Sequence, residues 1–158
     1  MYYICNNIAN IQKQINLQHC CIKKMSDLLK HKSIRITDFR LKVLDVFEKN
    51  TNAVSIKTIE TELANFDRTT LFRTLKTFIK KGLIHEVQLP NEEKMLALCD
   101  VTCTVDGHKH EHIHFKCETC NEVFCKQPEV NPNISIDGFL IKKVEINTTG
   151  ICKDCLLA

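Results

Sequence analysis

The chain has 158 residues, of which 44% are hydrophobic and 26% charged, with a formal net charge of +3 and ten cysteines. This length fits one ordinary domain or two small ones, and no run of about 18 apolar residues suggests a membrane span. The N-terminal sequence lacks the basic region, apolar core and small-residue cleavage site of a signal peptide. Four cysteines form Cys-x-x-Cys pairs near histidines, which favours a reduced, cytoplasmic, metal-bound protein over a secreted disulfide scaffold.

The positive charge is unevenly distributed. Residues 23–82 contain 14 Lys and Arg against 7 Asp and Glu, whereas the rest of the chain has a net charge of −4. A basic first half next to a mildly acidic, metal-rich second half indicates nucleic acid as the partner of the first half.

The basic half is predicted to be helical. After an N-terminal extension of uncertain structure at 1–24, the pattern predicts helices at 26–32, 37–49, 56–66 and 68–81. Each begins at a residue whose side-chain oxygen can accept a backbone N–H, and Gly82 ends the last helix. These N-caps are Ser26, Thr37, Ser55 and Asp67.

The last of these helices has two distinct faces. An apolar stripe contains Leu71, Leu75, Phe78 and Ile79, and the opposite face contains Thr69, Arg73, Lys76 and Lys80. Two helices joined by a short turn, the second with a basic outer face, form a helix-turn-helix pattern. A plain solvated surface is the alternative, but the charge of the whole region favours DNA.

A β-hairpin is predicted after the helices. Residues 83–89 and 94–99 alternate as strands, and a loop at Asn91–Glu93 would place His85 directly opposite Cys99. Three helices followed by a two-stranded wing make a winged helix. Residues 101–109 are predicted to be a hinge or linker.

The second half is organised around a histidine-rich strand. His108, His110, His112 and His114 alternate along it and so share one face. Further strands are predicted at 122–125 and 139–146. Two Cys-x-x-Cys pairs supply the four thiolates of a closed, structural zinc site. These cysteines are Cys117, Cys120, Cys152 and Cys155.

Taken together, these motifs resemble the ferric uptake regulator (Fur) superfamily of metal-dependent bacterial repressors over about residues 33–157. The resemblance includes Arg35-Ile-Thr37 with Arg40, the stretch Thr69–Leu75, Gly82-Leu83-Ile84, the His-x-His-x-His strand and Gly150-Ile151-Cys152-x-x-Cys155. It implies an α+β fold, with a winged helix-turn-helix domain at 25–100 and a small, mostly antiparallel metal-binding dimerisation domain at 110–158. It also implies a homodimer that binds a double-stranded DNA operator, with no enzymatic activity, no small-molecule substrate and no membrane association.

The resemblance suggests roles for residues of the DNA-binding domain. Phe72 stands where the family usually has tyrosine, so a hydroxyl contact is lost while ring packing on a thymine methyl or sugar remains available. Arg73 is the candidate for a groove contact. Candidate contacts to phosphates and nearby DNA are Arg35, Arg40, Thr69, Thr70, Lys76 and Lys80.

A regulatory metal between the two domains is also implied by the resemblance. His112 and His114 match usual ligand positions on the strand, and His85 and Cys99 match positions where zinc-sensing members carry ligands. These four would give a tetrahedral site of three nitrogens and one sulfur. Two further candidates that could substitute are His110 and Cys125.

The departures from the family pattern favour zinc as the regulatory metal. Iron and peroxide sensors use carboxylates and a histidine where this chain has Ala53, and the often acidic strand position is Ile113. The position that often carries a histidine before the terminal motif is Val144. Because a thiolate-rich, carboxylate-poor site selects Zn²⁺ over Fe²⁺ or Mn²⁺, the chain is most similar to the zinc uptake regulator (Zur) branch.

Other interpretations remain open at this stage. An iron or peroxide sensor is the main alternative, and reactive thiols at Cys99, Cys103 or Cys125 would suit a redox sensor. A zinc hydrolase is a more distant alternative, because no His-Glu-x-x-His helix is present. A zinc-ribbon interaction module is also distant, because the spacing between the cysteine pairs is long and the first half is basic and helical. His85 could also be an ordinary strand histidine, and Cys99 a small buried hydrophobe.

Overall fold

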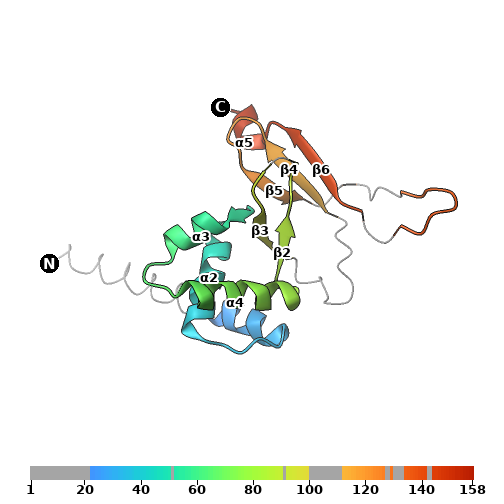
Figure 1. Cartoon of the computed structure of the whole chain (residues 1–158). Coiled ribbons are helices and arrows are strands. Elements are labelled where there is room, and N and C mark those ends of the chain that lie inside the picture. Colours follow the sequence, from blue (N-terminus) through green and yellow to red (C-terminus); the bar gives the residue numbers. More distant parts are fainter. Residues whose placement is uncertain are drawn as a thin grey trace.

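Two three-stranded sheets organise the computed structural model of the chain, shown in Figure 1. The first sheet belongs to the helical half, and the second to the cysteine-rich half. No helix in the described part of the chain has the length and apolarity to cross a membrane. The residues that the structure describes are 22–50, 52–90, 92–99, 112–126, 129, 134–141 and 144–158. The predicted linker at 101–109, residues 1–21 of the predicted extension, and His108 and His110 lie outside them.

Three of the four predicted helix starts are confirmed. Helices α2 (Asp38–Lys49), α3 (Ile56–Glu62) and α4 (Arg68–Lys80) begin after their predicted N-caps. Each cap side chain accepts a hydrogen bond from the backbone N–H three residues further on, which satisfies one of the unpaired donors of a first helical turn. The N-caps are Thr37, Ser55 and Asp67.

Two predicted helix boundaries were wrong. Residues 22–31 are helical, so Ser26 lies inside a helix instead of capping it. Met25 and Leu29 from this helix are buried in the core, and their packing extends the helix beyond the local capping signal. Helix α3 ends at Glu62 instead of Phe66, because the chain leaves the helical conformation at Leu63.

The first sheet contains the wing, defined here as strands β2 (Ile84–Val87) and β3 (Met95–Leu98) with their connecting loop. A third strand that was not predicted, β1 (Val54–Ser55), pairs with β3. The predicted register was wrong by two residues, since His85 pairs with Ala97 instead of Cys99. Within the loop, Gln88 Nε2 donates to the carbonyl oxygens of Leu89 and Glu92. A shift of two keeps every side chain on its predicted face.

The second sheet has the order β5-β4-β6, with β4 (Ile113–Cys117) in the centre. Strand β5 (Val123–Lys126) is antiparallel to β4, as the prediction at 122–125 required, whereas β6 (Ile146–Gly150) is parallel to it. The predicted strand at 139–146 was wrong. Its apolar residues Phe139 and Leu140 are 74% and 85% exposed, and the polar stretch that follows pairs with β4 through its backbone. A short helix, α5 (Lys153–Leu156), follows β6.

The wing lies between the helices and the second sheet, as Figure 1 shows. The large core under the helices includes Phe47, Phe78 and Leu83, each at most 2% exposed. A smaller buried cluster joins the wing to the second sheet through Val87 and Val123. The predicted α+β architecture of a winged helix followed by a small cysteine-rich sheet is therefore confirmed, and the smaller cluster brings His85 next to the histidine strand.

Candidate metal centres and nucleic-acid face

Three imidazoles and one thiol converge where the wing meets the second sheet. His85 comes from β2, His112 directly precedes β4, His114 lies on β4 and Cys125 lies on β5. The Nε2 atom of His112 lies 3.1 Å from Nε2 of His85 and 3.0 Å from Nε2 of His114. The Sγ atom of Cys125 lies 3.5 Å from Nε2 of His85. These groups thus point at a common centre, which we call the interdomain site.

The spacing of these atoms fits a tetrahedral metal ion. Zinc–nitrogen bonds of about 2.05 Å and zinc–sulfur bonds of about 2.3 Å place two nitrogens about 3.4 Å apart, and a nitrogen and a sulfur about 3.6 Å apart. The observed nitrogen–nitrogen distances of 3.0 and 3.1 Å and the nitrogen–sulfur distance of 3.5 Å are close to these values. The same distances also suit imidazole N–H···N hydrogen bonds, so the geometry is compatible with a metal ion without requiring one.

The far side of two of the imidazoles is occupied by a hydrogen-bond acceptor. Nδ1 of His85 lies 3.5 Å from Sγ of Cys99, and Nδ1 of His114 lies 3.3 Å from Oδ1 of Asn147. A proton on Nδ1 that is donated to such a partner leaves the Nε2 lone pair facing the common centre. The surrounding residues therefore favour the tautomers that metal ligation needs.

The interdomain site is mostly buried, with His112 and Cys125 half-buried. His85 and His114 are each only 6% exposed, and burial raises the pKa of the Cys125 thiol to about 11. Such a thiol stays protonated at neutral pH unless a positive charge is close by. Within the described residues, the converging group includes no Asp or Glu.

The cysteine that faces the interdomain site in the structure is not the one that the sequence favoured. The sequence favoured Cys99 together with His85, His112 and His114, and kept Cys125 as a substitute. In the structure Cys125 faces the common centre, whereas Cys99 lies against the opposite nitrogen of the His85 ring. Asn147 was missed, because nothing in the local sequence distinguishes it from an ordinary polar strand residue.

The four cysteines of the two Cys-x-x-Cys pairs form a second group. Parallel pairing places Cys117, at the end of β4, beside Gly150, at the end of β6, so the segments after both strands meet. The sulfurs of Cys120 and Cys152 are 3.9 Å apart, close to the distance of about 3.8 Å between two sulfurs on one tetrahedral zinc. All four sulfurs lie within 4.8 Å of one another.

Backbone amides around this cluster stabilise negative charge on one of its sulfurs, which favours cation binding. Backbone amides lower the pKa of the Cys117 thiol to about 6. The amide of Cys120 contributes most, followed by those of Cys152, which donates to the sulfur at 3.3 Å, and Thr119. The hydrogen bond with Cys152, burial, and then the thiols of Cys120 and Cys117 raise the pKa of Cys155 to about 12. The backbone thus stabilises the anionic form of Cys117, whereas Cys155 keeps its proton at neutral pH unless a cation binds beside it.

The outer face of α4 is exposed and basic. Arg73, Lys76 and Lys80 are exposed there, and Phe72 is 43% exposed. The guanidinium of Arg68, a residue that the sequence analysis missed, lies 5.8 Å from the centre of the Phe72 ring. The separation of four residues on a helix was the available signal. Arg68, Thr69, Phe72, Arg73 and Lys76 line a shallow hollow.

Three other candidates for DNA contacts, Thr70, Arg40 and Arg35, lie outside this hollow. The hydroxyl of Thr70 donates to Asp67 at 2.7 Å, so this residue takes part in the helix cap. Arg40 donates to the backbone oxygen of Arg35 at 2.7 Å and is half-buried, while Arg35 is exposed. The hydrogen bonds of Thr70 and Arg40 rigidify the ends of α4 and α2.

Comparison with known proteins gives consistent matches. The sequence profile of the ferric uptake regulator family matches residues 31–138. The ferric uptake regulation protein of Staphylococcus epidermidis is 30% identical over 141 residues, which cover 81% of this chain and 91% of that protein. A solved zinc uptake regulator complexed with zinc and DNA gives a TM-score of 0.62 at 21% identity, with 86% of this chain and 93% of that chain covered.

A second solved structure, the ferric uptake regulator of Vibrio cholerae, gives a TM-score of 0.52 at 18% identity. It covers 78% of this chain and 96% of that chain. Both structural matches show that the fold is shared.

Proposed function

Because the chain belongs to the ferric uptake regulator family, it is a metal-responsive transcription regulator and not an enzyme, and we propose that the metal it senses is zinc. The observation that carries this proposal is the convergence of three imidazole nitrogens and one thiol at the interdomain site. Its residues are His85, His112, His114 and Cys125.

The chemistry of this donor set favours zinc over iron and manganese. Imidazole and thiolate are good ligands for Zn²⁺, whereas Mn²⁺ prefers oxygen donors and Fe²⁺ sensors of the family use carboxylates. By the resemblance to the family, Cys125 stands where many members have a ligating glutamate, which would replace a hard oxygen donor with a soft sulfur. Four donors at tetrahedral spacing also match the usual coordination number of zinc.

The position of the ligands explains how a metal would act on the fold. His85 belongs to the wing, while the other three ligands belong to the second sheet or its edge. Ligation of one ion by all four holds the wing against the second sheet. We propose that this contact fixes the orientation of α4 in a homodimer, so that two recognition helices fit half-sites one helical turn apart.

The exposed face of α4 supplies the proposed contacts to double-stranded DNA. Arg73 is suited to a groove contact, and Lys76 and Lys80 to phosphates. Phe72 offers an apolar ring for a thymine methyl, and Arg68 stacks on that ring. The DNA complex of the structurally similar zinc uptake regulator supports this assignment. A cytoplasmic repressor of metal uptake genes is the role that follows.

A structural zinc at the four-cysteine cluster completes the proposal. The closed set of sulfurs leaves no position for a substrate or water, so the metal there stabilises the fold and takes no part in sensing. It would join the segments after β4 and β6 at the end of the sheet.

Iron is the second candidate for the sensed metal. The similar proteins of Staphylococcus aureus and Staphylococcus epidermidis, at 28% and 30% identity, are ferric uptake regulation proteins, which favours Fe²⁺. The absence of a carboxylate among the described residues at the interdomain site argues against it.

The deciding experiment is a metal titration of DNA binding. Protein whose four-cysteine cluster is loaded with zinc is mixed with DNA from its own promoter at buffered free Zn²⁺, Fe²⁺ or Mn²⁺. Activation by Zn²⁺ at the lowest free concentration supports the proposal. Activation only by Fe²⁺ or Mn²⁺ refutes zinc sensing, and no response to any metal refutes the metal switch.

A further inference from the structure

We infer that Asn147 is a positioning residue that couples the metal ligand His114 to the wing. The inference rests on the proposed function and deepens it by naming a residue that links the metal site to the DNA-binding half. Asn147 lies on β6 and hydrogen-bonds in two directions. Its Oδ1 lies 3.3 Å from Nδ1 of His114, and its Nδ2 donates to the backbone oxygen of Gln88 in the wing loop at 3.4 Å.

The wing fixes which way the Asn147 amide faces. A backbone carbonyl can only accept a hydrogen bond, so the oxygen of Gln88 requires the NH₂ group of Asn147 on the wing side. The amide oxygen must then face His114, where it accepts the proton of Nδ1. This leaves the lone pair of His114 on Nε2, the atom that faces the interdomain site.

The link works in both directions. When the wing leaves the second sheet, the carbonyl of Gln88 no longer holds the amide, and Asn147 can turn its NH₂ group toward His114. His114 would then accept at Nδ1 and carry its proton on Nε2, and in this tautomer Nε2 has no lone pair for a metal at the interdomain site. A wing in contact with the sheet therefore favours metal binding, and by linkage metal binding favours wing contact.

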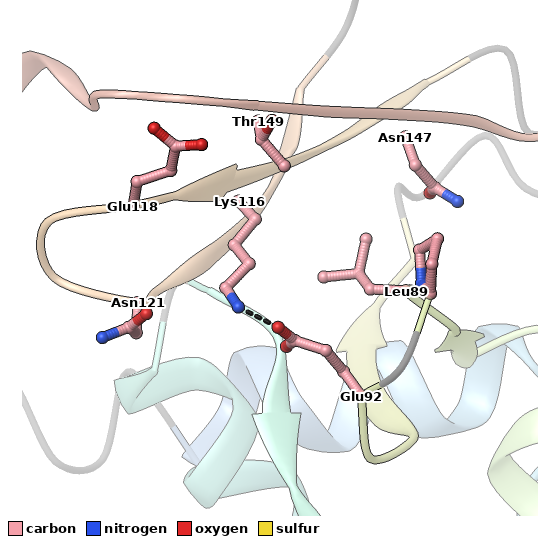
Figure 2. Close-up of a pocket in the computed structure, with 8 residues that line it drawn as sticks. Leu89, Glu92, Lys116, Glu118, Asn121, Asn147 and Thr149 are labelled. Carbon is pink, nitrogen blue, oxygen red and sulfur yellow. Dashed lines mark hydrogen bonds and ion pairs between the residues drawn. The ribbon is translucent and has the colours of Figure 1, made fainter.

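The surroundings of Asn147 allow this rotation. Asn147 lines a cavity of about 470 Å³ between the wing loop and the second sheet, together with Leu89 and Thr149. Figure 2 shows Asn147 on β6 beside Leu89, and the ion pair between Lys116 of β4 and Glu92 of the wing loop. The ion pair also ties the wing loop to the second sheet, but it does so through β4 instead of β6, and neither of its residues belongs to the interdomain site. Asn147, by contrast, contacts both the wing loop and the ligand His114.

The test compares two substitutions of Asn147 with a control. Asn147→Asp keeps an acceptor for His114 but loses the donor to Gln88, whereas Asn147→Ala loses both. Thr149→Ala changes the same face of β6 and the same cavity without touching His114. For each protein, zinc affinity without DNA is measured by chelator competition, and DNA affinity is measured with and without zinc.

The expected results separate ligand positioning from coupling. Asn147→Asp keeps zinc affinity within about threefold of the wild type, because the His114 contact survives, while Asn147→Ala lowers it about tenfold. In both variants the zinc-dependent gain in DNA affinity falls about fivefold, the ratio expected for one lost hydrogen bond. In both variants the DNA affinity without metal stays at the wild-type value. Thr149→Ala keeps the wild-type zinc affinity and the wild-type zinc-dependent gain in DNA affinity.

Two outcomes would overturn the inference. One is an unchanged zinc-dependent gain in Asn147→Asp, and the other is an equal loss in Thr149→Ala. The wild-type arm tests the proposed function separately. If Fe²⁺ or Mn²⁺ activates the wild type and zinc does not, the zinc proposal fails and the same comparison is made with the activating metal. If no metal activates the wild type, both fail.

Discussion

The two cysteines on either side of the His85 ring should respond very differently to substitution. Cys125 lies 3.5 Å from Nε2, at the spacing of two ligands on one zinc, while Cys99 lies 3.5 Å from Nδ1 on the far side. Four-ligand zinc sites bind with about 10–16 kcal/mol, so one ligand contributes about 2.5–4 kcal/mol, or roughly 10²–10³ in affinity. We expect Cys125→Ser to lose that factor. Cys99→Ser should lose less than about tenfold, because a hydroxyl can also accept the Nδ1 proton.

Chelator competition measures these affinities, and cobalt gives an independent signal. With zinc retained in the four-cysteine cluster, Co²⁺ at the interdomain site should show a sulfur-to-metal charge-transfer band in the wild type and in Cys99→Ser. The band should disappear in Cys125→Ser. The opposite pattern, with the band lost in Cys99→Ser and kept in Cys125→Ser, would refute the geometric argument and restore the ligand set favoured by the sequence.

Three further predictions concern other parts of the molecule. Cys152→Ala should lower the zinc content by one equivalent per chain and the thermal unfolding temperature, measured by metal analysis and calorimetry, and an unchanged zinc content would refute the four-cysteine site. Arg73→Ala should cost about 1–3 kcal/mol of operator preference in gel-shift titrations at constant metal content, and unchanged preference would exclude α4 as the reading helix. Hydrogen bonds from Thr70 hold the pKa of Asp67 below its usual value of 3.8. Asp67 therefore stabilises α4 above about pH 3.8 and loses this contribution as the pH falls through its lowered folded pKa. Asp67→Asn should flatten this part of the stability–pH curve, and an unchanged curve would contradict the cap.

Local signals allowed the helices of the first half to be predicted. Thr37, Ser55 and Asp67 each act within one helical turn, so sequence alone contains the interaction that starts the helix. Ser26 offered the same chemistry, but Met25 and Leu29 are buried in the core and continue the helix through it. Tertiary packing therefore overrides a capping signal when the preceding turn carries core residues.

The strands were less predictable because their partners are distant in sequence. Strand β1 has only two residues and exists through its pairing with β3. Strand β6 is polar, and its position depends on backbone bonds to β4, while the more apolar stretch before it is exposed at Phe139 and Leu140. Alternation and hydrophobicity give no information on which segment a central strand selects as its neighbour.

The composition of the interdomain site was partly accessible from the sequence. The period of two correctly placed His112 and His114 on one side of the strand. The sequence favoured Cys99 over Cys125, whereas in the structure both lie beside His85 and Cys125 faces the common centre, an arrangement that depends on how the two sheets meet. Register within a hairpin is a local property, whereas the packing of the wing on the second sheet depends on buried residues such as Val87 and Val123.

The two metal sites proposed here differ in what they connect. Strand β4 carries His114 near its start and Cys117 at its end, so both sites share one strand. All sulfurs of the four-cysteine cluster belong to the second sheet and the segments that follow its strands, and none comes from the wing. The interdomain site draws His85 from the wing, and it is complete only while the wing contacts the sheet. A closed site within one unit contributes to folding, and a site divided between two units makes their contact depend on free metal concentration. We therefore propose a structural role for the four-cysteine cluster and a sensing role for the interdomain site, because of the units that each connects more than because of its ligand chemistry.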